Sequence, residues 1–321
     1  MNAYIEIESL RSLISQNKDD RYYECMRMLK RNLNLNFSFS KEEARADHAI
    51  EIWVKELSTG AISEKPKWES DYPNQYDELS LQDMTLEKLC AVYLLDDEEP
   101  QHLANAMLVS HFGHELDTLS RLFVKTDTQE FELQQSPRQI ANWNSLSEYI
   151  AQCSDILLAD RYILSKRSML RKNLYQIINA LVKKSRDVCI SIVLIVESKS
   201  VDTSIDLNDV SDTIKENVKS IVGMAPNVTF MLCSPHEGTP LFHDRLILTN
   251  YRAISSGDSF NYFREDGRIN TGGFGITISS LAKNCTYVKD QVANTFLLQL
   301  GKEIPYALIK GDRKSNFLKF S

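Results

Sequence analysis

Residues 241–261 combine side chains that are suited to phosphate chemistry. The segment begins Leu-Phe-His243-Asp-Arg245-Leu-Ile-Leu-Thr and continues to Ser-Ser-Gly257-Asp-Ser. Alternate side chains of a strand share a face, so His243 and Arg245 are expected to point the same way. A guanidinium binds phosphate through two oriented donors, and an imidazole attacks phosphorus or transfers a proton. The pattern therefore predicts phosphate binding or phosphodiester chemistry. A local ion pair at the end of a strand is the plain structural alternative.

The segment resembles the signature of the phospholipase D superfamily, His-x-Lys-x4-Asp followed by a cluster of Gly, Ser and Asn. Here it reads His243-x-Arg245-x4-Asn250, and then Gly257-Asp-Ser-Phe-Asn261. It is more similar to a divergent branch, the phospholipase-D-like domain that follows the MIT domain in an ESCRT-associated protein, and to bacterial relatives of that domain.

Two upstream sequence elements resemble motifs of the same branch. They are Asp160-Arg-Tyr162 and the pair Asn173-Leu174. With them, the resemblance covers about residues 150–300 and leaves the first 150 residues outside it.

The resemblance implies a role for each matching residue. His243 corresponds to the nucleophile that forms a phosphohistidine, Arg245 to the phosphate clamp, and Asn250 to the carboxylate that orients the imidazole. The implied phosphate-binding cluster comprises Gly257, Ser259 and Asn261. No metal or other cofactor is implied.

Two departures from the signature bear on activity. Arg245 replaces Lys and keeps the charge, whereas Asn250 replaces Asp and removes the group that holds a cationic imidazole. Only one motif is present, so catalysis would require a homodimer that brings two copies of His243 together. Within one chain, His236 is the alternative proton donor.

A run of basic residues follows the predicted strand 156–159. Eight Lys and Arg residues lie within residues 161–186. A solvated helix face explains such a run, and contact with nucleic acid or anionic lipid is the alternative. The phosphate-binding set predicted from this run comprises Arg161, Arg167, Arg171 and Lys172.

The C-terminal part alternates strands with helices. Strands are expected near 156–159, 188–197, 227–233, 242–249, 251–255 and 276–279, and helices near 166–184, 207–222 and 286–300. This order predicts an α/β phospholipase-D-like domain with a buried mixed sheet, over residues 151–321.

Residues 1–150 are predicted to form a separate, mostly helical α+β domain. Residues 1–35 have largely helical periodicity, residues 32–39 alternate as a strand, and Ser40 with Glu43 fits a capping box that opens a helix to Leu57. Residues 58–80 are predicted to be a loop, and further helices are expected over 86–95, 101–122 and 143–153. This domain is a candidate arm for binding a protein partner.

Charge and composition support that division. Residues 1–150 carry 15 Lys and Arg against 27 Asp and Glu, whereas residues 151–321 carry 22 against 17. An anion-binding role therefore belongs to the C-terminal part. The six cysteines are scattered, no long apolar run indicates a membrane-spanning segment, and the N-terminus does not resemble a secretory signal, so a cytoplasmic protein is expected. His111 and His114 are predicted to be a surface cluster.

Two functions remain open from the sequence. The first is a degenerate phospholipase-D-like protein that recognises a phosphate-bearing ligand, nucleic acid in preference to lipid, as a component of a bacterial antiviral defence system. The second is an active, metal-independent phosphodiesterase or nuclease that uses His243 in a homodimer.

Overall fold

The computed structural model divides into two compact units, unit 1 (Met1–Lys125 and Ser280–Asn284) and unit 2 (Thr126–Ser279 and Cys285–Ser321). It describes residues 1–16, 18–59, 66–70, 90–96, 108–110, 112–123, 129–132, 142–233, 245–269, 275–282, 308–315 and 317–318. Residues 129–148, which the composition shift assigns to the first domain, contribute elements to unit 2. Within the described residues, no helix has the length and apolar character needed to cross a membrane.

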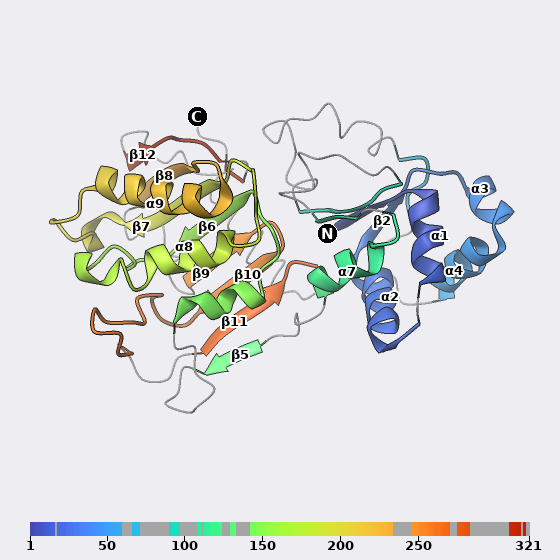
Figure 1. The fold of residues 1–321 in the computed structure, drawn as a ribbon, viewed down its shortest axis with the longest axis horizontal. Helices are drawn as coiled ribbons and strands as arrows, with labels where there is room; N and C mark the ends of the chain where they lie inside the picture. The colour runs from blue at the N-terminus through green and yellow to red at the C-terminus, as the bar shows by residue number, and fades with distance from the viewer. Residues whose placement is uncertain are drawn as a thin grey trace. The chain divides into compact units, whose positions relative to one another are not determined.

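Unit 1 is built on a parallel sheet. Its strands lie in the order β2-β1-β3-β4, and all three neighbouring pairs are parallel. Figure 1 shows α1, α2 and α7 beside this sheet, and α7 packs against both α1 and α2. The elements of unit 1 are β1 (Asn2–Ile5), α1 (Ile7–Ser15), α2 (Asp20–Asn32), β2 (Asn34–Phe37), α3 (Lys41–Ala46), α4 (His48–Thr59), β3 (Val92–Leu94), β4 (Leu108–Ser110) and α7 (Glu115–Phe123).

The described part of unit 1 contains more helix than strand, as the sequence predicted, but its strands form one parallel sheet, which is typical of an α/β unit and not of the expected α+β arrangement. The expected strand at 32–39 is present as β2, and the expected capping box is present at the start of α3, where Ser40 and Glu43 bond reciprocally. The helix expected to run to Leu57 is broken into α3 and α4. The break occurs at Asp47, whose carboxylate accepts from the amides of Ala49 and Ile50 and so caps the start of α4.

The described residues of unit 2 form a mixed sheet of eight strands in the order β12-β8-β7-β6-β9-β10-β11-β5. Strands β6, β7 and β8 are parallel to one another, and β9 runs antiparallel to β6. The elements are β5 (Gln129–Glu132), η3 (Trp143–Glu148), β6 (Asp155–Ala159), η4 (Arg167–Met169), α8 (Leu174–Val182), β7 (Ser191–Glu197), η5 (Ser198–Ser200), α9 (Leu207–Val222), β8 (Asn227–Cys233), β9 (Arg245–Thr249), β10 (Arg252–Ser256), β11 (Gly275–Ser280) and β12 (Ile309–Gly311).

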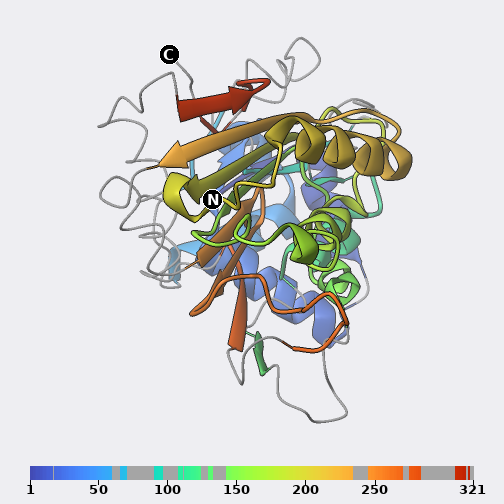
Figure 2. The same cartoon turned by 90° about the vertical axis from the view of Figure 1, so that its left-hand side faces the viewer.

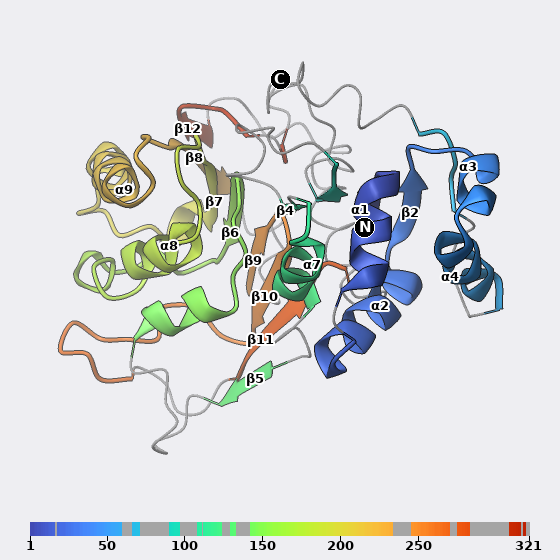
Figure 3. The same ribbon diagram turned by 45° about the vertical axis from the view of Figure 1, so that its right-hand side comes forward.

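Helices α8 and α9 cover one face of this sheet, as Figures 2 and 3 show. All residues of β6 and β7 are buried, which explains why these strands read as continuous apolar runs instead of alternating. Helix α9 begins at an Asp206 cap and ends at Gly223, which adopts a left-handed conformation (φ 95°). This α/β architecture with a mixed sheet agrees with the fold class expected for the C-terminal part.

Candidate functional site

One edge of the unit 2 sheet collects the ends of several strands. Strands β6, β7 and β8 all have their carboxyl ends there, and the antiparallel β9 begins there at Arg245. Ala159 pairs with Leu246, so Asp160 lies at the level of Arg245, and Ser256 at the end of β10 pairs with Arg245. Open α/β sheets bind ligands at the carboxyl ends of their strands, so this edge, here called the Arg245 edge, is the candidate site.

Asp160 holds the Arg245 edge together. Its side chain is fully buried and accepts three hydrogen bonds, from the amide of Tyr162 at 2.8 Å, the hydroxyl of Ser259 at 2.8 Å and the amide of Phe260 at 2.6 Å. Burial raises the pKa of Asp160, and the three donors and the nearby charge of Arg245 act in the opposite direction. The carboxylate thus fixes the 257–261 loop against the end of β6.

Arg245 is half-buried at the first position of β9. Its Nη1 donates to the carbonyl oxygen of the exposed Gly257 at 2.9 Å. The guanidinium is therefore anchored just after the end of β10, and its positive charge acts on the buried Asp160 carboxylate. A guanidinium held in this way has a fixed orientation, which favours recognition of a planar or tetrahedral oxyanion.

Ser259 and Asn261, which the resemblance assigns to phosphate binding, have intramolecular partners. The Ser259 hydroxyl donates to Asp160, and the Asn261 amide group donates to the carbonyl of Tyr162. The backbone amide of Asn261 donates to Ser259 Oγ at 3.2 Å. These hydrogen bonds shape the loop that carries Gly257, and each of them is made to another group of the protein.

Asn250 lies at the opposite end of β9 from Arg245. It is fully buried, and its Oδ1 accepts from the amides of Ser154 at 2.9 Å and Asp155 at 3.2 Å, while its Nδ2 donates to Ser154 Oγ at 3.1 Å. The two positions are five residues apart along the chain, which is about 16 Å of extended backbone. Asn250 therefore closes the start of β6 and lies away from the Arg245 edge, and its role of orienting the His243 imidazole stays a prediction.

Arg161 is neutralised within the protein. Its Nε and Nη2 bind both carboxylate oxygens of Glu197, at 2.7 and 2.6 Å, and its guanidinium lies 5.3 Å from the ring centre of Tyr162. The Glu197 side chain is only 3% exposed, and the hydrogen bonds from Arg161 lower its pKa. This bidentate pair joins the ends of β6 and β7. The role of Arg161 is therefore mainly structural, because Glu197 balances its positive charge.

The predicted basic helix begins later than expected, because residues 167–173 form η4 and turns before α8 starts at Leu174. The guanidinium of Arg167 donates to the carbonyl of Ser204 at 2.8 Å and lies 4.0 Å from Asp209. Arg171 is exposed and borders, with Arg167, a small groove of about 200 Å³ that also contains two aspartates. Lys172 is half-buried. All these residues lie on the connection that leaves β6 at the Arg245 edge.

The histidine predicted to be the nucleophile, His243, lies outside the described residues, and so do Asp244, His236 and His111. The described His114 is exposed, 3.8 Å from Asp117. Across the described ranges, no group of His, Cys, Asp or Glu side chains is arranged to hold a metal ion.

An aromatic and amide cluster supports the Arg245 edge and was not expected from the sequence. Trp143 Nε1 donates to Asn173 Oδ1 at 3.1 Å, and Asn173 also binds both backbone groups of Phe263. The Trp143 ring packs against those of Phe260, Tyr262 and Phe263. The resemblance pointed to Asn173, but its partner Trp143 lies 30 residues earlier and carries no local signal.

In the sheet of unit 1, the strand order reverses between β1 and β3. Two carboxylates, Glu6 and Asp96, follow the carboxyl ends of these two strands. Glu6 accepts from the amide of Asp96 at 2.6 Å, and Asp96 accepts from the amides of Glu8 and Ser9 at the start of α1. Both carboxylates therefore serve as backbone caps. The position of Asp96 after β3 is therefore explained by its capping of backbone amides and requires no bound ligand.

A comparison of the chain with protein-family models and with curated proteins finds no match. The function of unit 2 is therefore inferred from its own residues and their arrangement.

Proposed function

We propose that unit 2 binds a phosphate-bearing ligand, nucleic acid in preference to lipid, at the Arg245 edge. The observation that carries this proposal is the position of Arg245. It stands at the edge where three parallel strands end, with its Nη1 held by the carbonyl of Gly257 and a buried carboxylate fixing the loop beside it. Such an arrangement orients a guanidinium before the ligand arrives, which reduces the entropy lost on binding.

The charge of the surrounding chain favours a nucleic acid backbone. Residues 151–321 carry 22 Lys and Arg against 17 Asp and Glu, although the whole chain is acidic. Exposed Lys166 and Arg171 lie on the connection that leaves β6 at the Arg245 edge. A phosphate backbone can engage several such charges along its length, with a strong dependence on salt.

Binding is tested by fluorescence anisotropy with labelled single-stranded DNA and RNA, and with phosphatidylserine vesicles as the lipid alternative, in excess EDTA. Arg245→Ala is expected to weaken nucleic acid binding about tenfold or more. The matched control is Arg186→Ala, which removes the same charge from an exposed residue before β7, at the opposite edge of the sheet. Equal losses in the two variants would show non-specific attraction, and binding to vesicles alone would assign the site to lipid.

A second candidate function, a metal-independent phosphodiesterase, is supported by the position of Asn250. The replacement of the signature carboxylate at this position weighs against catalysis only if the residue orients the motif histidine. Asn250 instead bonds to the backbone at the start of β6, so the replacement leaves the Arg245 edge unchanged. His243 stands two residues before Arg245 in the sequence.

Cleavage of the same labelled DNA and RNA in excess EDTA separates the two candidates. Cleavage by the wild type that is lost in His243→Ala would establish a histidine-dependent phosphodiesterase. A homodimeric mechanism further predicts that the specific activity falls on dilution below the dimer dissociation constant, as measured together with analytical ultracentrifugation. Binding without cleavage would favour the phosphate-binding module.

A further inference from the structure

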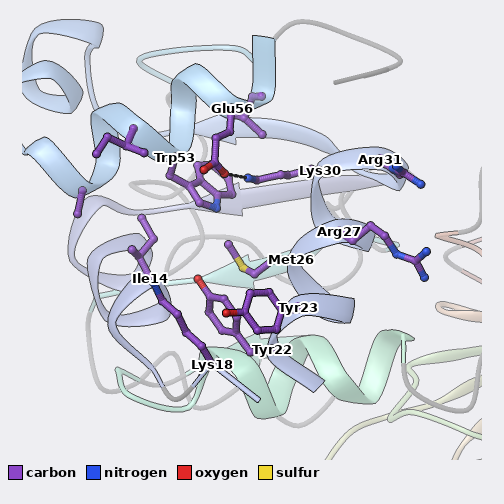
Figure 4. Close-up of a pocket in the computed structure, with 13 residues that line it drawn as sticks. Ile14, Lys18, Tyr22, Tyr23, Met26, Arg27, Lys30, Arg31, Trp53 and Glu56 are labelled. Atoms are coloured by element: carbon purple, nitrogen blue, oxygen red, sulfur yellow. Dashed lines mark hydrogen bonds and ion pairs between the residues drawn. The ribbon is translucent and has the colours of Figure 1, made fainter. Parts of the chain in front are cut away.

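Unit 1 contains a groove between α1, α2 and α4 that no part of the proposed function uses. Its volume is about 450 Å³, and it is drawn in Figure 4. This volume lies within the range of pockets that bind small ligands or a few anchoring side chains. Its walls are mainly apolar, including Ile14, Met26, Ile52 and Leu57.

Two of its apolar side chains are unusually exposed. Tyr23 is 59% exposed and Ile52 is 45% exposed. They come from different helices, α2 and α4, on either side of the groove. Apolar surface grouped around a concave site is typical of surfaces that bind a partner.

The indole of Trp53 gives the groove an unused hydrogen-bond donor. Trp53 is only 5% exposed, and its Nε1 is buried with no hydrogen-bond partner among the described residues. Figure 4 shows this nitrogen directed into the space between α1 and α2. A buried N–H without an acceptor is unfavourable, so an occupant that supplies an oxygen atom there is stabilised by that contact.

The groove also has a strong excess of positive charge. Among the described residues that line it, four are basic, namely Lys18, Arg27, Lys30 and Arg31, and one, Glu56, is acidic. Lys30 is held by Glu56 at 2.6 Å and lies 5.1 Å from the ring centre of Trp53, whereas Arg27 and Arg31 are exposed. This concentration occurs in a part of the chain, residues 1–150, that is otherwise acidic, with 15 Lys and Arg against 27 Asp and Glu.

We propose that this groove binds an acidic, amphipathic segment of a protein partner. Apolar side chains of the segment lie against Tyr23, Met26 and Ile52, and a backbone carbonyl or carboxylate accepts from Trp53 Nε1. Acidic side chains on its flanks face Arg27 and Arg31. An amphipathic helix laid into a groove combines these features through anchors at positions i, i+3, i+4 and i+7. The aliphatic side chains of Ile14, Ile52 and Leu57 lie beside the aromatic rings in the groove wall and favour apolar peptide side chains as the occupant.

The binding test uses a set of fluorescein-labelled peptides of about 14 residues, with Leu or Phe at the anchor positions and Glu elsewhere. Matched peptides have Lys in place of Glu, and a labelled oligonucleotide serves as the other anionic probe. The full chain is used in three forms besides the wild type: the double variant Arg27→Glu with Arg31→Glu, the variant Ile52→Asp, and the control Arg45→Glu on α3. Arg45 is exposed and lies outside the groove, so its reversal changes charge alone.

The acidic peptides are expected to bind the wild type and the Arg45→Glu control alike. The double variant and Ile52→Asp are each expected to weaken binding about tenfold or more. In a ¹⁵N NMR titration, the Nε1–H signal of Trp53, assigned with Trp53→Phe, should move downfield as it gains an acceptor. The altered side chains are exposed, so the variants are expected to remain folded. Melting temperatures close to that of the wild type will show that they do.

Four results would overturn the proposal. Equal binding of the basic peptides would show apolar adsorption without charge selection. Competition by the oligonucleotide would make nucleic acid the occupant. Failure of every acidic peptide to bind, or binding that leaves the Trp53 signal in place, would show that the groove is not the contact surface.

Discussion

Replacing Asp160 tests whether a single buried carboxylate organises the Arg245 edge. In Asp160→Ala, the three donors at 2.6 to 2.8 Å lose their acceptor. The half-buried Ser259 hydroxyl can rotate toward water, which leaves two backbone amides, those of Tyr162 and Phe260. Each buried donor without an acceptor costs about 1–3 kcal/mol. Removal of the buried charge offsets part of this loss, so unit 2 is expected to lose about 3 kcal/mol of unfolding free energy.

Asp160→Asn provides a graded version of the same change. The amide has one oxygen, and if it takes the place of Oδ2 it still accepts from Ser259 and Phe260. Its nitrogen then faces the Tyr162 amide, so one of the three bonds is lost. The expected cost is about 1 kcal/mol, clearly below that of the alanine variant.

The assay is urea unfolding followed by the fluorescence of Trp143, whose ring contacts Phe260. Trp53 and Trp68 are replaced by Phe so that the signal reports on unit 2. Asp212→Asn, a matched change on the exposed side of α9, is the control and should leave the transition midpoint in place. An alanine variant no less stable than the asparagine variant, or an asparagine variant as stable as the wild type, would refute the assigned role of the carboxylate.

Three further changes probe other parts of unit 2. Glu197→Gln should reduce stability by about 1 kcal/mol at pH 7. Because Arg161 lowers the pKa of Glu197, this difference should shrink as the pH falls below the ordinary value of 4.5, and a difference that persists in acid would contradict the pairing. Gly311→Ala should cost about 2 kcal/mol or more, since φ is 89° and a Cβ would lie 2.2 Å from the Val228 carbonyl oxygen; an unchanged melting temperature would argue against this close approach of β12 to β8. Asn250→Ala should lower the melting temperature through two unpaired amides at the start of β6 and leave oligonucleotide affinity of the folded protein intact, whereas lost affinity would place Asn250 in the site.

Elements with strong local signals were predicted accurately. The helix expected at 207–222 has these bounds as α9, because its apolar period is regular and Gly223 provides a left-handed end. The strand expected at 227–233 is β8, and the pairing expected between 242–249 and 251–255 occurs between β9 and β10.

Strands β3 and β4 of unit 1 were predicted wrongly for a physical reason. The helix expected over 86–95 contains β3, and that expected over 101–122 contains β4 followed by α7. Strands β3 and β4 are buried throughout, so they lack the alternation that distinguishes a strand from a helix. The run Ala-Val-Tyr-Leu-Leu at 91–95 fits either structure.

The candidate site was only partly accessible to sequence reasoning. The motif identified Arg245 and Gly257, which do meet, because Arg245 begins β9 and Gly257 directly follows the adjacent strand β10. The contact between Asp160 and Ser259 spans 99 residues, and the pairing of Arg161 with Glu197 spans 36. Such contacts depend on strand order, which the spacing of residues does not specify.

The strand order of unit 2 also bears on how the chain is made. Its sheet is bordered by β5 and β12, the first and last of its described strands along the chain. A ribosome therefore releases the central strands β6 and β7 well before β12 is available to cover β8. During that interval β8 presents unpaired backbone groups, which are a template for pairing with other chains. We expect nascent or truncated chains that end before Ile309 to depend on chaperones for solubility more than the full chain does.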